Sequence, residues 1–115
     1  MAKHSPDLDY LFMALSDPTR RAVIARLARG AATVGELASA HEMALPTFIA
    51  HLGKLERAGL IRTEKVGRVR RCMLVPDAFA PATDWLAEQR CLWEARLDRF
   101  DDYVMRLAKE ARDET

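Results

Sequence analysis

Residues 33–75 read TVGELASAHEMALPTFIAHLGKLERAGLIRTEKVGRVRRCMLV, and this stretch decides the fold. It opens with a capping box, because the Thr33 hydroxyl can accept from the backbone N–H of Glu36 while the Glu36 carboxylate reaches back to the Thr33 N–H. We therefore predict a short helix from Thr33 to about His41. A longer helix is predicted over residues 45–58, and it ends at Gly59, a residue suited to the left-handed conformation after a helix. Its apolar face is predicted to consist of Leu45, Phe48, Ile49, Leu52 and Leu55.

The rest of this stretch has the pattern of a β-hairpin. Residues 60–65 and 69–75 are rich in β-branched and aliphatic side chains, and Val66-Gly67-Arg68 lies between them. A glycine-centred turn between two such segments predicts an antiparallel pair. Pro76 ends the second strand, because proline cannot donate to a strand ladder.

Two further helices are predicted before residue 33. Apolar residues at helical spacing predict a helix over residues 8–15, and Ser16-Asp17-Pro18 interrupts it. Asp17 can cap the next helix, in which Pro18 occupies the first position, where its missing N–H is harmless. That helix is expected to end near Gly30. Its buried stripe is predicted to consist of Val23, Ile24, Leu27 and Ala28. Its exposed side is predicted to carry Arg20, Arg21, Arg26 and Arg29.

A long helix is predicted over residues 81–111. Two apolar columns repeat there at intervals of seven residues, a period typical of helices that pair along a seam. We expect one mainly helical domain over residues 1–115, of element order α-α-α-α-β-β-α, which dimerises through its first and last helices. The predicted interface residues are Leu8, Leu11, Phe12, Leu86, Trp93, Leu97, Phe100, Val104 and Leu107.

Charge is distributed unevenly along the chain. Residues 18–75 hold eleven Lys and Arg against four Asp and Glu, a balance of +7, whereas residues 1–17 and 76–115 have balances of −2 and −4. A basic middle segment suits a surface that faces a polyanion. With a helix-turn-helix pattern and an arginine-rich hairpin in this segment, we predict double-stranded DNA as the partner. The predicted contacts are Pro46, Thr47, Ala50, His51, Lys54 and Arg57 on the longer helix, and Arg68, Arg70 and Arg71 on the hairpin.

Four motifs resemble the ArsR family of winged helix-turn-helix transcriptional repressors. They are Ser16-Asp17-Pro18-Thr19-Arg20-Arg21, Thr33-Val34-Gly35-Glu36-Leu37, Leu45-Pro46-Thr47-Phe48 with His51-Leu52, and Leu55-Glu56-Arg57-Ala58-Gly59-Leu60-Ile61. The resemblance covers about residues 8–76. It implies a homodimeric repressor that binds a pseudo-palindromic operator and is relieved by a signal, which the sequence leaves unidentified. Ala44, Ile49 and Ala50 depart from the family's pattern, which often has polar residues there.

No pattern for a metal site or a cofactor is present. Members of the family that sense metals resemble one another in having cysteines on the helix before the recognition helix, or histidines and carboxylates on the last helix. Here residues 33–40 contain no cysteine, and no histidine follows His51. We interpret Cys72 and Cys91 as small buried apolar residues, with a thiol-switched regulator as an alternative.

Other functional classes have weaker support. No nucleophile elbow, glycine-rich phosphate loop or scaffolded carboxylate pair indicates an enzyme. A winged-helix module that binds a protein partner is the alternative from another class, and Trp85 and Trp93 could line an effector pocket. No apolar run approaches the roughly 20 residues of a membrane span, so we expect a cytoplasmic protein without membrane contact.

Overall fold

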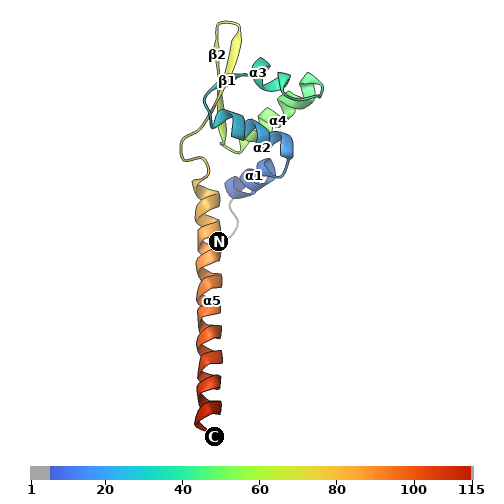
Figure 1. The fold of residues 1–115 in the computed structure, drawn as a ribbon. Coiled ribbons are helices and arrows are strands. Elements are labelled where there is room, and N and C mark those ends of the chain that lie inside the picture. Colours follow the sequence, from blue (N-terminus) through green and yellow to red (C-terminus); the bar gives the residue numbers. More distant parts are fainter. Residues whose placement is uncertain (1–5, 115) are drawn as a thin grey trace. The chain divides into compact units, whose positions relative to one another are not determined.

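The computed structural model describes residues 6–114, which form two compact units divided after Ala82. The first unit contains four helices, a small sheet and the first turn of the last helix (Figure 1). Its elements are α1 (Pro6–Leu15), α2 (Pro18–Leu27), β1 (Ala32–Thr33), α3 (Val34–Ser39), α4 (Leu45–Arg57), β2 (Ile61–Val66) and β3 (Val69–Leu74). The second unit is the remainder of α5 (Ala80–Asp113). The predicted element order is confirmed, with β1 as an addition.

The predicted helix ends are set by local hydrogen bonds. The Asp17 carboxylate accepts from the backbone N–H of Arg20 at the start of α2. Thr33 and Glu36 form the capping box at the start of α3, with N···O distances of 3.1 and 3.2 Å. These bonds satisfy donors that the first turn of a helix leaves without partners.

The end of α4 shows how sequence fixes the connection to the sheet. Gly59 has φ +75°, its N–H donates to the Glu56 carbonyl, and the Leu60 N–H donates to the Leu55 carbonyl. This pair of bonds is a Schellman motif, in which a residue after the helix packs on its last turn. Leu55 and Leu60 are both fully buried. The turn therefore directs the chain from α4 into β2.

The sheet has three antiparallel strands in the order β1-β3-β2. The β2–β3 hairpin closes at Gly67 and Arg68, since Val66 pairs with Val69. Gly67 has φ +65° and Arg68 has negative φ, the order found in type II′ hairpin turns. The hairpin extends beyond the helices and is hereafter called the wing (Figure 1). The two-residue strand β1 pairs with Cys72 and Arg71, and it is too short for sequence periodicity to detect.

One apolar cluster joins all elements of the first unit. Phe48, Leu55, Leu60, Ile61 and Cys72 are among its most deeply buried members. Ala82, in the first turn of α5, also belongs to it. A continuous core of this kind fixes α4 and the wing in one unit.

Several predicted burial assignments are wrong. Leu45 and Ile49 are 56% and 45% exposed, because the buried stripe of α4 consists of Phe48, Leu52 and Leu55. Ala28 is exposed after the end of α2. Leu11, predicted at a dimer interface, is only 2% exposed and packs in the core of its own chain.

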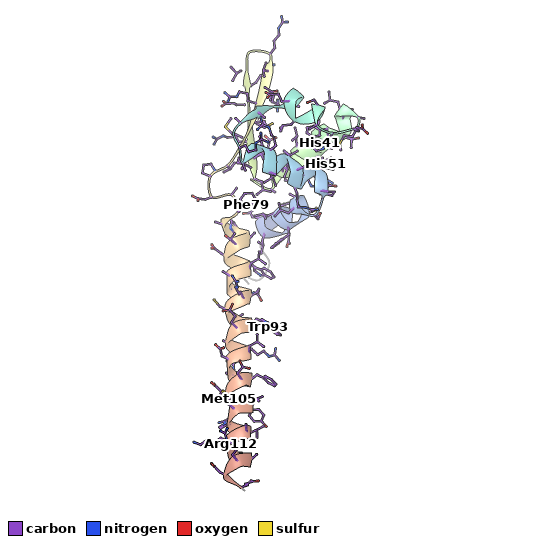
Figure 2. The ribbon with its side chains drawn as sticks, viewed as in Figure 1. His41, His51, Phe79, Trp93, Met105 and Arg112 are labelled. Carbon is purple, nitrogen blue, oxygen red and sulfur yellow. The ribbon has the colours of Figure 1, made fainter. Side chains whose placement is uncertain are left out.

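Helix α5 contains 34 residues and is about 51 Å long at 1.5 Å per residue. The predicted apolar columns follow it, and their large side chains are 42–61% exposed in the single chain. Trp93 and Met105 extend outward from the helix (Figure 2). The large exposed column residues are Leu86, Trp93, Leu97, Phe100, Val104 and Leu107.

Candidate nucleic-acid interface

The surface of α4 that faces away from the core carries a mixture of polar and apolar side chains. Thr47, Lys54 and Arg57 are exposed there, together with Pro46 and Ala50. Lys54 and Arg57 also lie in the last turn, where cations interact favourably with the helix dipole. Five of the six predicted contact residues on α4 therefore lie at its surface.

His51, the sixth, lies on the inner side of α4. Its side chain is 18% exposed, and Nδ1 lies 2.9 Å from Nη1 of Arg20 and 3.8 Å from Oδ2 of Asp17. Because a guanidinium can only donate, Nδ1 accepts this bond, and the neutral ring carries its proton on Nε2. The predicted role of His51 as a DNA contact does not agree with this placement. Its ring instead holds α4 against the start of α2.

Arg20 is the centre of this arrangement, and its predicted place on the exposed side of α2 is wrong. It is 5% exposed. Nε donates to the Ala14 carbonyl at 2.7 Å, Nη2 donates to the Met13 carbonyl at 3.0 Å, and Nη1 donates to His51. The guanidinium thus donates to two carbonyls in the last turn of α1, where regular helical donors end, and it shares the Met13 carbonyl with the N–H and the hydroxyl of Ser16. We call Arg20 with its three acceptors the arginine clamp, because it joins α1, α2 and α4.

The strand register divides the charges of the wing between two faces. Residues directly opposite each other in an antiparallel pair point to the same face. Lys65 pairs with Arg70, two residues from the Thr63–Cys72 pair, so these four residues share one face. Arg71 pairs with Glu64 on the other face. The predicted contacts Arg70 and Arg71 therefore point in opposite directions.

The Arg70 face is the one next to α4. Arg70 Nη1 donates to Thr63 Oγ1 at 3.3 Å, and that hydroxyl donates to Glu56 Oε2 at 3.3 Å. A hollow of about 300 Å³ lies at this junction, with Ile49, Gly53 and Arg70 among its lining residues. Sequence reasoning missed Glu56 and Thr63 as residues that link the wing to α4. The sequence does contain a signal for the faces of the wing. A two-residue turn at Gly67 and Arg68 pairs Lys65 with Arg70, and residues paired in this way point to the same face.

Among residues 6–114, three titratable groups have clearly shifted pKa values. Burial alone would raise the pKa of Asp17, but the hydrogen bond from the Arg20 backbone N–H and the positive charge of the Arg20 guanidinium outweigh burial and lower the pKa. The pKa of Glu36 is lowered mainly by its hydrogen bonds with Thr33. Burial, assisted by the Glu56 carboxylate, raises the pKa of the Cys72 thiol.

The two cysteines differ in their surroundings. Cys72 is buried, as predicted, whereas Cys91 is exposed on α5, contrary to its interpretation as a buried apolar residue. The residues of α5 on either side of Cys91 are all exposed in the single chain, so the Cys91 thiol is accessible to solvent.

Within residues 6–114, no three His, Cys, Asp or Glu side chains are grouped as a metal site would require. No helix in that range combines the length and apolar character needed to cross a membrane.

Comparison with known proteins identifies relatives of both the helix-turn-helix segment and the larger fold. Residues 15–64 match a family model described as a helix-turn-helix domain. The HTH-type transcriptional regulator Rv2034 of Mycobacterium tuberculosis is 39% identical over 72 residues, which are 63% of this chain and 67% of the relative. The transcriptional repressor SdpR of Bacillus subtilis is 28% identical over 79 residues, 69% of this chain and 88% of SdpR.

Solved structures extend this similarity to most of the chain. The crystal structure of the ArsR family transcriptional regulator RHA00566 is 53% identical, with a TM-score of 0.77 over 82% of this chain and 97% of that one. An ArsR-like transcriptional regulator from Rhodococcus sp. RHA1 is 28% identical, with a TM-score of 0.71 over 82% and 89% of the two chains. These matches confirm the predicted fold and family. The chain belongs to the ArsR family of transcriptional regulators.

Proposed function

We propose that this chain represses transcription as a homodimer that binds a pseudo-palindromic DNA operator. Helix α4 enters the major groove, and the Arg70 face of the wing contacts the flanking phosphates. The observation that carries this proposal is the adjacency of two basic surfaces within one packed unit. Lys54 and Arg57 are exposed on α4, and Arg70 lies next to that helix, because the Thr63 hydroxyl to which it donates is itself bonded to Glu56 of α4.

Each surface has a distinct task in this proposal. Lysine and arginine contacts with phosphates supply most of the affinity without reading sequence. Arg68 at the tip of the wing, with Lys65 and Arg70 on the face next to α4, suits this task. Thr47 near the start of α4 is placed to approach base edges, since a recognition helix contacts bases mainly through its first turns. Arg71, on the opposite face, is left out of the proposed contact set.

The apolar columns of α5 support the homodimer. A single chain leaves six large apolar side chains of these columns 42–61% exposed along one helix. Monomeric proteins rarely expose continuous apolar surface of this extent. We propose that a second copy covers it, with α1 contributing from each chain, so that the winged-helix unit and α5 act as one DNA-binding domain. Tyr10 and Met13 on α1 are 41% and 58% exposed and are suited to this interface.

Two measurements test the proposal together. Fluorescence anisotropy with DNA from upstream of the chain's own reading frame, at two salt concentrations, should show tight binding that weakens steeply with salt and depends on sequence. Scrambled DNA of the same composition is the control. Analytical ultracentrifugation at micromolar concentration should show a dimer. Equal, weak binding to both DNAs, or a monomer at that concentration, would contradict the proposal.

A further inference from the structure

The exposed side of α4 displays apolar groups where base-reading side chains would be expected. Ile49 is 45% exposed, and Ala50 beside it is also exposed. The core stripe of the helix consists of Phe48, Leu52 and Leu55, which are at most 4% exposed. Ile49 and Ala50 therefore do not fill the core, and both side chains are available to contact a ligand of α4.

Base edges in the major groove differ in what they offer to such side chains. Guanine is read by Arg or Lys, adenine by Asn or Gln, and cytosine by Glu or Asp, whereas thymine presents an apolar C5-methyl group. Positions 49 and 50 have no hydrogen-bonding side chain. Of the four bases, only thymine offers a group that an isoleucine or alanine side chain can contact favourably.

We propose that Ile49 and Ala50 are specificity-determining residues that read thymine methyl groups in the operator. This inference rests on the proposed DNA-binding function and adds the chemistry that each half-site must present. Lys54 and Arg57 lie on the same exposed side of α4 as Ile49 and Ala50. Binding of a polyanion such as DNA depends on such positively charged side chains. The apolar pair is therefore placed in a basic surrounding, which favours DNA over an apolar protein partner.

Gly53, one turn after Ile49 and Ala50, agrees with a close approach of DNA. Glycine is unfavourable inside a helix compared with alanine. A Cβ atom added at Gly53 would meet no atom of the chain within 4 Å, so packing within the chain does not require glycine. Without a side chain there, the backbone of α4 can lie nearer to the floor of the groove.

Replacing thymine by deoxyuridine tests this inference directly, because the exchange removes only the C5-methyl group. Duplexes that bind the full chain are first selected from a random library, and their protected half-sites are mapped. Thymines inside the half-sites are then replaced one at a time by deoxyuridine, with thymines outside them as the control. We expect affinity to fall about fourfold for each contacted methyl group, the effect of one buried carbon.

Protein variants assign the effect to its residues. Ile49→Ser and Ala50→Ser should bind thymine and deoxyuridine duplexes with similar affinity, whereas Ile49→Val should retain the preference for thymine. Ala25→Ser changes an exposed alanine on α2 and serves as the matched control, with an unchanged preference. Both target positions are exposed, so these variants are expected to fold.

The outcomes separate this inference from the proposed function. If the selected duplexes bind tightly and with salt dependence, but deoxyuridine has no effect at any half-site position, thymine reading is wrong and DNA binding stands. If the preference persists unchanged in both serine variants, the assignment to Ile49 and Ala50 is wrong. If no duplex is enriched and binding is independent of salt, both proposals are wrong.

Discussion

Replacing Arg20 by methionine should unfold the first unit at much lower denaturant concentration. The side chain is 5% exposed and makes three hydrogen bonds of 2.7 to 3.0 Å. Hydrogen bonds from a charged group contribute about 1.5 to 3 kcal/mol each. The Met13 carbonyl keeps its bonds from Ser16, so the Ala14 carbonyl and His51 Nδ1 are the acceptors whose lost bonds add to this cost. The substitution also removes the free-energy cost of burying the Arg20 charge, which offsets part of the loss from the broken hydrogen bonds. We expect the free energy of unfolding to fall by about 3 kcal/mol, or Tm by about 10 to 20 °C.

Urea unfolding followed by far-UV circular dichroism measures this effect at one fixed protein concentration, because dimerisation makes stability depend on concentration. Arg21→Met is the matched control. Arg21 is the next residue of the same helix, and its Nη1 donates to the Leu15 carbonyl at 2.7 Å, but it is exposed. Its loss should cost less than about 1 kcal/mol. Equal effects of the two substitutions would refute the role of the arginine clamp.

Three further predictions concern His51, the thiols and acid sensitivity. His51→Leu removes the acceptor of one Arg20 bond and should lower the urea-unfolding free energy by about 1 to 3 kcal/mol; unchanged stability would contradict that bond. An alkylating reagent followed by mass spectrometry should modify exposed Cys91 rapidly and Cys72 only on unfolding, because burial raises the pKa of the Cys72 thiol; equal rates would contradict this difference. The pKa of Glu36 is lowered in the folded chain from its ordinary value of 4.5, so its stabilisation is present above that pH and is lost on acidification. Glu36→Gln should therefore weaken the chain at neutral pH and reduce the loss of stability between about pH 5 and pH 3, measured by urea unfolding; an identical pH profile would contradict the shift.

The features predicted correctly from sequence are those that local chemistry determines. The caps at Asp17 and Thr33, the left-handed Gly59 and the turn at Gly67 each depend on a few neighbouring residues. The long apolar repeat of α5 is also predictable, since its period extends over many turns. The element order follows from these local signals. Three of the four family motifs contain one of these capping residues, so the family resemblance and the local chemistry depend on the same positions.

Side chains that act between elements were predicted less well. The inner side of α4 carries the buried residues Phe48, Leu52 and Leu55 and the half-buried His51, which follow the helical pattern i, i+3, i+4 and i+7. The predicted apolar face also included Leu45 and Ile49, which are exposed, and this placed His51 on the opposite, outer side. Burial of Arg20 was not predictable from its own helix, because its acceptors belong to α1 and α4.

The wing shows the same limit for charges. Composition indicated a cluster of arginines, and strand alternation puts Arg70 and Arg71 on opposite faces, but only the hydrogen bonds from Arg70 to Thr63 and from Thr63 to Glu56 show which face lies next to α4. The short strand β1 pairs across a long stretch of chain, and two residues are too few to give a periodic signal. Prediction from sequence therefore located the basic surface but not its direction.

The salt dependence of DNA affinity for Arg70→Ala and Arg71→Ala tests the central claim most directly. Each phosphate contact contributes about one unit to the slope of log affinity against log salt concentration. The proposed interface predicts a steep slope for the unaltered chain, a slope reduced by about one for Arg70→Ala, and little change for Arg71→Ala. A slope near zero for the unaltered chain, or equal reductions in both variants, would contradict an interface formed by α4 and one face of the wing.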